Sequence, residues 1–262
     1  MNGLHARRVS GEDAAMNHMP HVLVVAGSDS SGGAGIVRDI ETLAAIGVKA
    51  SVAITAVTVQ THHGVEHVDA MAPDRVAQQM RAALSANPIA AIKIGMLAAS
   101  ATIAAVARVL ADHPGIPVVL DPVLVSTSGR ALLTPDATDA LRGLFGSCAL
   151  ITPNLPELSA LAVSIPATSA DSVRNQAQAL LTAGAQAVLV KGGHGDGAKS
   201  TDILFRAEQA DQPFAAPRLA VAMRGTGCML ASAIAARLAF GDTLSTAITG
   251  AKAFVHTKLR ET

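Results

Sequence analysis

The chain has 262 residues, and its 20 basic and 20 acidic side chains give a formal net charge of zero. Only 2 % of the residues are aromatic, with no Trp and no Tyr. Nucleic-acid partners favour clustered Lys and Arg and stacking rings, so this composition argues against one. Half of the residues are hydrophobic. A core of Ala, Val, Leu and Ile fits helices packed on a parallel sheet.

The predicted elements alternate between strand and helix. Short apolar runs predict strands at 22–26, 51–57, 91–94, 118–120, 150–152 and 187–190. Helical periodicity predicts helices at 36–46, 74–85, 101–111, 136–145, 172–182, 228–240 and 243–258, with Asp74 as the N-cap of the second. Segments 203–206 and 214–221 predict a hairpin or an edge pair. This alternation predicts an α/β fold, a mostly parallel sheet with helices on both faces.

The N-terminal residues and the two cysteines give further information about the domain organisation and the cellular environment. Residues 1–20 are polar and predict a flexible leader, and 21–262 predict a single domain. No apolar stretch of about 18 residues appears, so we expect no membrane span. The two cysteines, Cys148 and Cys228, form no CxxC pair and suggest a reducing cytoplasm. Cys148 has an apolar context and is predicted to be inert core.

Polar or glycine-rich residues end several predicted strands. In open α/β sheets, ligands bind at the carboxyl ends of the strands, so we expect the chemistry at this edge. The residues concerned are Asp29, Gln60, Lys93 to Gly95, Asp121, Asn154 and Lys191.

The segment Arg224-Gly225-Thr226-Gly227-Cys228 directly precedes a long apolar run. Two glycines around a threonine at a helix start leave backbone N–H groups free, and the helix dipole there attracts anions. A cysteine at such a place is expected to have a lowered pKa and to act as a nucleophile or base. The alternative is a glycine turn before a buried helix, with Cys228 as a small core residue.

Three other segments carry candidate chemistry. AGSDSSGGAG at 26–35 matches neither a Walker A loop nor GxGxxG, but its backbone can approach a ligand closely. Asn154 and Glu157 offer oxygen ligands of the kind Mg²⁺ prefers, and equally fit a helix capping box. Lys191, before two glycines, can reach a phosphate or be a solvated turn residue. Asp121 can bind metal or substrate, or simply precede Pro122 in a turn.

Seven motifs together resemble the hydroxymethylpyrimidine/phosphomethylpyrimidine kinases of thiamine biosynthesis, in the ribokinase-like superfamily. They are AGSDSSGGAG at 26–35, Gln60, KIGML at 93–97, DPV at 121–123, TPNLPE at 152–157, VKGGH at 190–194 and GTGC at 225–228. The resemblance spans about 22–258. It implies a three-layer ribokinase-like fold, a homodimer, and phosphorylation of a hydroxymethyl group and then of the monophosphate, using ATP and Mg²⁺.

The resemblance also implies residue roles. Cys228 would deprotonate or orient the substrate hydroxyl, while the amides of Gly225, Thr226, Gly227 and Cys228 form the anion hole. Gln60 would hydrogen-bond the pyrimidine. The remaining implied contacts are Gly27, Ala34, Met96, Val123 and nearby Asp39 for the substrate; Lys191, Asn154 and Thr226 for the nucleotide; and Glu157 and Asp121 for the metal.

The chain departs from the family pattern in a few places. Arg224 and Met229 stand where the family usually has His and Thr, and no Gly- and Pro-containing tail follows the last helix. Arg224 either helps to bind a phosphorylated substrate or marks a changed nucleotide site. Two alternative functions therefore stay open: a pyridoxal or pyridoxine kinase, and a non-catalytic pyrimidine-binding homologue.

Overall fold

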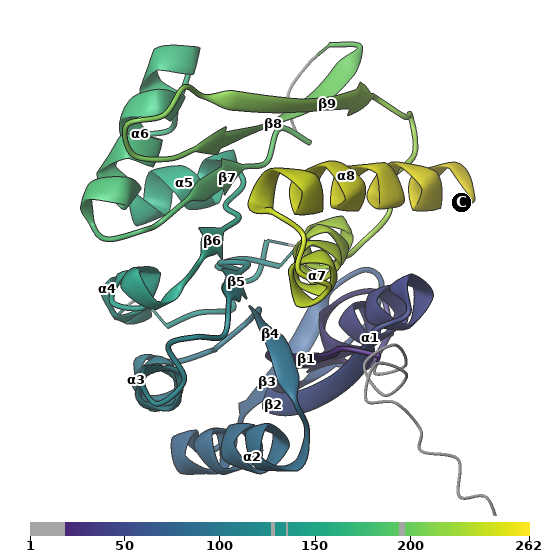
Figure 1. The fold of residues 1–262 in the computed structure, drawn as a ribbon, viewed down its shortest axis with the longest axis vertical. Helices are drawn as coiled ribbons and strands as arrows, with labels where there is room; N and C mark the ends of the chain where they lie inside the picture. Colours follow the sequence, from purple (N-terminus) through teal and green to yellow (C-terminus); the bar gives the residue numbers. More distant parts are fainter. Residues whose placement is uncertain (1–18, 127–128, 135, 194–196) are drawn as a thin grey trace, which may run out of the picture.

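A computed structural model describes residues 19–126, 129–134, 136–193 and 197–262. Almost all of the predicted leader, 1–18, and His194 of the VKGGH motif lie outside these residues. The described residues form one nine-stranded sheet in the order β3-β2-β1-β4-β5-β6-β7-β8-β9, with helices on both faces (Figure 1). The predicted α/β class is confirmed.

The six strands from β2 to β7 across the sheet are parallel, and β3, β8 and β9 pair antiparallel at the two edges. The bounds of the strands are β1 (His21–Asp29), β2 (Lys49–Gln60), β3 (Val65–Ala70), β4 (Ile89–Ile94), β5 (Val118–Leu120), β6 (Leu150–Ile151), β7 (Val188–Val190), β8 (Lys199–Phe205) and β9 (Gln212–Pro217).

The helices connect these strands. Their bounds are α1 (Gly35–Ile46), α2 (Pro73–Ala86), α3 (Ser100–Ala111), α4 (Ala137–Arg142), α5 (Leu155–Leu161), α6 (Ala170–Thr182), α7 (Thr226–Ala239) and α8 (Leu244–Arg260), with a 3₁₀ turn at Phe145–Ser147. None of the described helices is long and apolar enough to cross a membrane.

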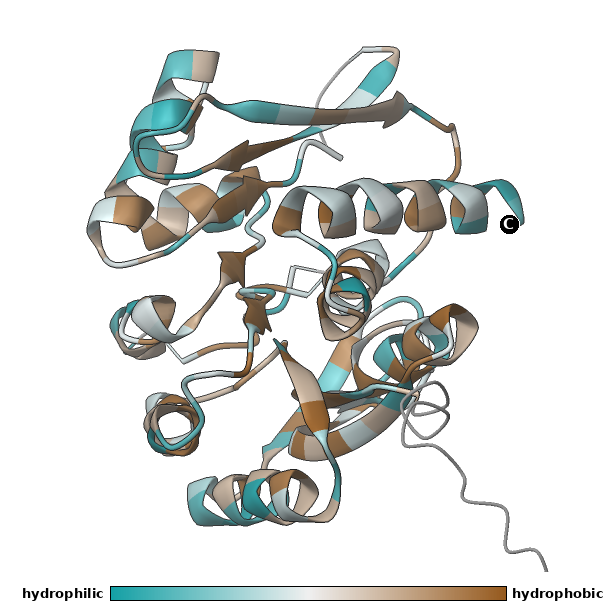
Figure 2. Cartoon of the chain, viewed as in Figure 1, coloured by the Kyte–Doolittle hydropathy of each residue, from teal (hydrophilic) through white to brown (hydrophobic). Residues whose placement is uncertain are grey.

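The core lies in two layers because side chains alternate between the faces of each strand. On β1, Val22 and Val24 join the cluster under α1, α7 and α8, whereas Leu23 and Val25 join the cluster under α2 to α6. Figure 2 shows the matching pattern, with hydrophobic colour on the central strands and hydrophilic colour on the outer faces of the helices. Aliphatic strands buried on both faces explain the high hydrophobic content.

The strand order reverses at β1, which lies between β2 and β4. The chain moves outward from β1 to β2 and β3, then returns to place β4 on the other side of β1. Such a switch point is where open α/β sheets bind ligands. Helix α7 packs against β1, β4 and β5 at this place.

Some predicted elements differ from the structure. Strand β3 was not predicted because only Val65 of its six residues is buried, so its pattern is that of a polar edge. The predicted cap Asp74 is wrong: α2 begins at Pro73, with Ala72 as N-cap and Asp74 in the first turn. Strand β9 ends at Pro217, before the apolar residues that suggested 214–221.

Candidate active site

Three charged side chains meet where β5, β6 and β7 end. Lys191 Nζ donates to Asp121 Oδ1 at 2.7 Å and lies 3.7 Å from Glu157 Oε2. The chain after β6 runs beside Lys191, and Thr152 Oγ1 also donates to Asp121 Oδ1, at 3.3 Å. The solvated-lysine alternative is therefore wrong for Lys191, and Asp121 both precedes Pro122 in a turn and pairs with Lys191.

Glu157 and Asn154 form the capping box that the sequence offered as an alternative. Asn154 Oδ1 accepts from the Glu157 amide at 2.9 Å, and Glu157 Oε2 accepts from the Asn154 amide at 2.8 Å. The box starts α5 at Leu155 and fixes the Glu157 carboxylate toward Lys191. Capping and ligand binding do not exclude one another here, because Asn154 keeps its side-chain amide nitrogen for another partner.

The electrostatics keep Lys191 charged. Burial alone would lower its pKa, but the carboxylates of Asp121 and Glu157 outweigh burial and raise it. Burial raises the pKa of Glu157, with Lys191 opposing it. One cation thus faces two carboxylates at the end of the sheet.

The GTGC turn lies directly beside this cluster. Gly225 has φ of +73° and precedes α7, and the first helical hydrogen bond runs from Met229 N–H to Gly225 C=O at 2.9 Å. A Cβ atom on Gly227 would lie 3.2 Å from Lys191 Nζ and 3.7 Å from Asp121 Oδ2. The first turn of α7, whose amides have no helical partner, therefore lies beside a lysine and a carboxylate.

Cys228 is partly accessible, unlike the buried Cys148. Burial raises the pKa of the Cys228 thiol to about 11, although the charge of Lys93 and a hydrogen bond from the Gly35 backbone act to lower it. The expected lowering of this pKa is wrong for the protein without ligands, because desolvation and the charges of Asp39 and Asp121 outweigh the helix terminus. Cys148 is inert core as predicted, since burial raises its pKa to about 12.

Asp39, expected near the substrate, is fully buried. Its two oxygens accept from Lys93 Nζ at 2.8 Å and Ser232 Oγ at 2.7 Å, which joins α1, β4 and α7. Burial alone would lower the pKa of Lys93, but Asp39 raises it, with smaller contributions from Cys228 and Asp121. Asp39 therefore has no surface for direct contact with a substrate in this structure.

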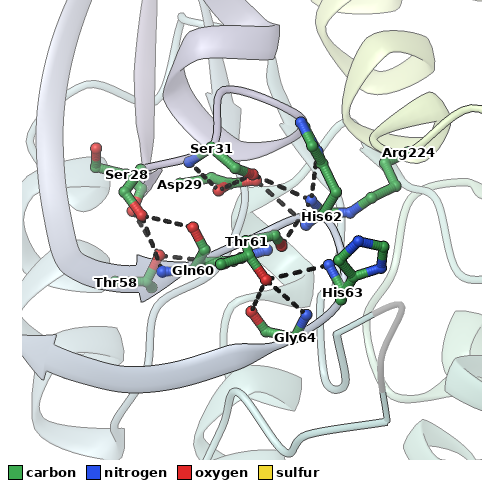
Figure 3. A network of polar contacts seen from close by, with 11 residues as sticks. Ser28, Asp29, Ser31, Thr58, Gln60, Thr61, His62, His63, Gly64 and Arg224 are labelled. Carbon is green, nitrogen blue, oxygen red and sulfur yellow. Dashed lines mark hydrogen bonds and ion pairs between the residues drawn. The ribbon is translucent and has the colours of Figure 1, made fainter.

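Gln60 ends β2, beside the glycine-rich loop after β1. Its Oε1 lies 3.1 Å from Thr58 Oγ1, whose single proton is shared between this oxygen and the carbonyl of Ser28 at 2.9 Å (Figure 3). The Gln60 backbone exchanges two hydrogen bonds with Ser30 Oγ, both at 2.8 Å. Gln60 is thus fixed to β1, with its side-chain amide nitrogen left for a ligand.

The small and apolar residues expected around the substrate ring also gather here. A Cβ on Gly27 would lie 3.2 Å from Met96 Sδ, and Val123 packs against the cluster that contains Met96. A Cβ on Gly225 would lie 3.2 Å from the Cα of Ala34. Gly27, Met96 and Val123 therefore lie together, and Ala34 contacts the GTGC turn.

The structure contains one network that no sequence motif indicates. Arg224 contacts Asp29, Ser31, Thr61 and His62 across two loops (Figure 3). No sequence signal predicted these partners, because they lie more than 160 residues from Arg224.

Comparison with known proteins agrees with this geometry. The family model described as phosphomethylpyrimidine kinase matches residues 29–262. The chain belongs to this family. A hydroxymethylpyrimidine/phosphomethylpyrimidine kinase of Mycobacterium bovis is 46% identical over 249 residues, which cover 92% of this chain and 88% of the relative. The predicted kinase family is confirmed, and the chain is a phosphotransferase.

Two solved structures show the fold in detail. The phosphomethylpyrimidine kinase of Clostridium difficile 630 has a TM-score of 0.79 and 33% identity, covering 92% of this chain and 99% of that one. An ADP complex of Bacillus subtilis pyridoxal kinase has a TM-score of 0.83 and 30% identity, covering 90% of each chain. The ribokinase-like fold is therefore confirmed, and nucleotide use fits this fold.

Proposed function

We propose that this protein phosphorylates 4-amino-5-hydroxymethyl-2-methylpyrimidine, and then its monophosphate, with ATP in thiamine biosynthesis. One observation carries the proposal: the N-terminus of α7 lies between the Lys191 cluster and the loops around Gln60. Gly227 approaches Lys191 and Asp121, while Gly225 packs on Ala34. A phosphoryl donor and a hydroxyl acceptor bound on these two sides would meet at Cys228.

The Gln60 side suits an aminopyrimidine. An amide both donates and accepts, and a ring nitrogen beside an amino group offers the complementary pair. Thr58 occupies one lone pair of Gln60 Oε1, which leaves the second lone pair and the amide nitrogen. Gly27, Met96 and Val123 offer a small apolar border for a flat ring.

The Lys191 side suits a nucleotide with Mg²⁺. Asp121 Oδ2 makes no hydrogen bond with the residues that the structure describes, and it faces Gly227. Asp121 and Glu157 are the hard oxygen donors that Mg²⁺ shares with phosphates. Bound Mg²⁺ would neutralise phosphate charge, while Lys191 would turn from Asp121 to a phosphate oxygen and Asn154 and Thr226 would donate to others.

Cys228 and the turn before it would act on the reacting groups. The Cys228 sulfur would orient the substrate hydroxyl and, in its thiolate form, accept the hydroxyl proton as the oxygen attacks and become the neutral thiol. The amides of Thr226, Gly227 and Cys228 would stabilise charge on the moving phosphoryl group. The fully buried Lys93 fixes a positive charge beneath the sulfur.

Turnover tests the proposal most simply. ATP consumption is measured with the hydroxymethylpyrimidine, its monophosphate and pyridoxal, each with and without Mg²⁺. We expect Mg²⁺-dependent turnover of both pyrimidines. Pyridoxal preferred more than about tenfold in kcat/KM would contradict the substrate assignment. Binding of the pyrimidine without any turnover would support the non-catalytic alternative instead.

We also propose that residues 21–262 act as one unit and form a homodimer. The exposed Val57 and Val59 on β2, near the sheet edge, offer apolar surface that a second copy would cover. Sedimentation equilibrium should give twice the chain mass, and a monomer at micromolar concentration would contradict this.

A further inference from the structure

Arg224 bridges two loops that belong to different strands. Its Nη1 donates to Ser31 Oγ and to the carbonyl of Thr61, both at 3.1 Å, and lies 3.3 Å from His62 Nδ1. Its Nη2 donates to Asp29 Oδ2 at 3.3 Å. Figure 3 shows the guanidinium between the loop after β1 and the turn between β2 and β3.

The Asp29 carboxylate needs this partner. Its side chain is only 4% exposed, and Oδ1 already accepts from the amide of Ser31 at 2.9 Å and its hydroxyl at 2.7 Å. Arg224 is the only cation paired with Asp29 among the residues that the structure describes. Removing one partner of a shielded ion pair leaves the other charge without compensation, which is costly.

The fit around the guanidinium is close. A Cβ on Gly33 would lie 3.1 Å from Arg224 Nη1 and 3.4 Å from His62 Nδ1, so glycine makes room for the bridge. Two side chains of the same loop, Asp29 and Ser31, and the Thr61 carbonyl already occupy the Nη atoms. Three of the five guanidinium N–H groups are therefore engaged within the protein, which favours a role in holding these loops over a role as phosphate ligand.

The bridge acts next to Gln60 and next to the anion hole. Thr61 directly follows Gln60, and Gly225 directly follows Arg224. Ser30, between the two Arg224 contacts in the first loop, holds the Gln60 backbone. A substitution of Arg224 should therefore displace the Gln60 side-chain amide, because it alters the backbone contacts on both sides of Gln60.

We propose that Arg224 is a positioning residue that holds the 29–33 loop and the 61–64 turn together around the acceptor substrate. The proposal rests on the proposed function, because it assigns the pyrimidine to the Gln60 side. Arg224 sets the position of Gln60 and contributes to the affinity for both the pyrimidine and its monophosphate. It does not act as the phosphate ligand that its sequence position suggested.

The test compares Arg224→Ala, Arg224→Lys and Asp29→Asn with the control Arg174→Ala, whose arginine pairs with Asp171 and Asp211 on and near α6. For Arg224→Ala we expect KM to rise about tenfold for both pyrimidines, with KM for ATP changed less than about twofold. Lysine should restore part of the effect, since it supplies charge without the planar fork. Asp29→Asn should raise the same KM values.

Two patterns would overturn the proposal. A rise in KM for the monophosphate alone would make Arg224 a phosphate ligand. An equal rise in KM for ATP, or no change, would remove its positioning role.

Hydrogen exchange of the protein without ligands tests the Arg224 bridge independently of the substrate assignment. In Arg224→Ala, the amides of residues 61–64 should exchange at least about tenfold faster than in the wild type, while those of β5 to β7 stay unchanged. Unchanged exchange at 61–64 would contradict the bridge even if both pyrimidines are substrates. Faster exchange there with no pyrimidine turnover in the wild type would instead refute only the proposed function.

Discussion

The two sides of the candidate active site are held by different forces. On one side, the ion pairs among Asp121, Lys191 and Glu157 are fixed to strand ends and a capped helix start. On the other, Gln60 is held by neutral hydrogen bonds within loops, and a distant arginine closes those loops. The first side has its charges close together before any ligand arrives. The second depends on how two loops are placed.

This difference suggests a division of labour. A preformed charge cluster suits the nucleotide, which is the ligand that all kinases share. The charges of its phosphates and metal can replace the ion pairs within the cluster. Loops held by hydrogen bonds can become specific for a different ligand when a few residues are substituted, because loops tolerate sequence variation. Cys228 lies where the two sides meet. Phosphoryl transfer should therefore need both sides, whereas binding of either ligand should need only one.

The largest expected effect is at the junction. Cys228→Ala should lower kcat by on the order of 10²- to 10⁴-fold, because the group that takes the hydroxyl proton is lost. Pyrimidine affinity should change little. The control Cys148→Ala should keep its kcat, since that thiol is buried in the core. Steady-state and single-turnover kinetics measure both variants, and full turnover by Cys228→Ala would remove the cysteine from the mechanism.

The second prediction concerns the charge state of that sulfur. With a pKa of about 11, the Cys228 thiol is neutral at pH 7, and its thiolate fraction rises with pH up to that value. Alkylation by iodoacetamide in the protein without ligands should therefore accelerate about tenfold per pH unit between pH 7 and 10. Cys228→Ala should show no such labelling while folded. A plateau reached by pH 8 would restore the lowered pKa that the helix terminus suggested.

The third prediction concerns the buried ion pair of Lys93 and Asp39, which connects the two sides through the core. Lys93→Ala leaves Asp39 buried without its cation, so the free energy of unfolding should fall by about 3–5 kcal/mol. Urea denaturation measures this, with the exposed Lys49→Ala as the control. Lys93→Met combined with Asp39→Asn should recover part of the loss, because no charge is then left unpaired. A single variant within about 0.5 kcal/mol of the wild type would show that the pair contributes nothing.

The smallest expected effect concerns the metal. Asp121→Asn keeps a polar group beside Lys191 but removes a charged oxygen, so the Mg²⁺ concentration for half-maximal rate should rise about tenfold. The matched control is Asp139→Asn, whose side chain is 89% exposed on α4. Titration of the rate with Mg²⁺ measures both. An unchanged midpoint in Asp121→Asn would place the metal elsewhere.

The same contrast separates what the sequence could predict from what it could not. Asp121, Asn154 and Lys191 follow short apolar strands, and the carboxyl ends of parallel strands must meet at one edge. Their convergence follows from topology alone. The Arg224 contacts depend on how the chain before α7 crosses two loops. The local sequence does not predict this long-range arrangement.

Burial accounts for the remaining errors. The motif gave Cys228 a helix terminus, which lowers a thiol pKa, but not the desolvation and nearby carboxylates that raise it more. The family resemblance implied that Asp39 lies near the substrate, but not that Lys93 and Ser232 enclose its carboxylate. Both depend on packing between elements far apart in the chain. Strand β3 was missed because an edge strand with polar side chains shows little hydrophobic pattern.

The division between the two sides is tested most directly by calorimetric binding of ADP and of the hydroxymethylpyrimidine, each to Lys191→Ala and to Gln60→Ala. Lys49→Ala and Gln78→Ala are exposed controls. Lys191→Ala should bind ADP at least about tenfold more weakly and the pyrimidine normally, and Gln60→Ala should show the reverse. Loss of both ligands in either variant, or the opposite pairing, would contradict two separate sides that meet at Cys228.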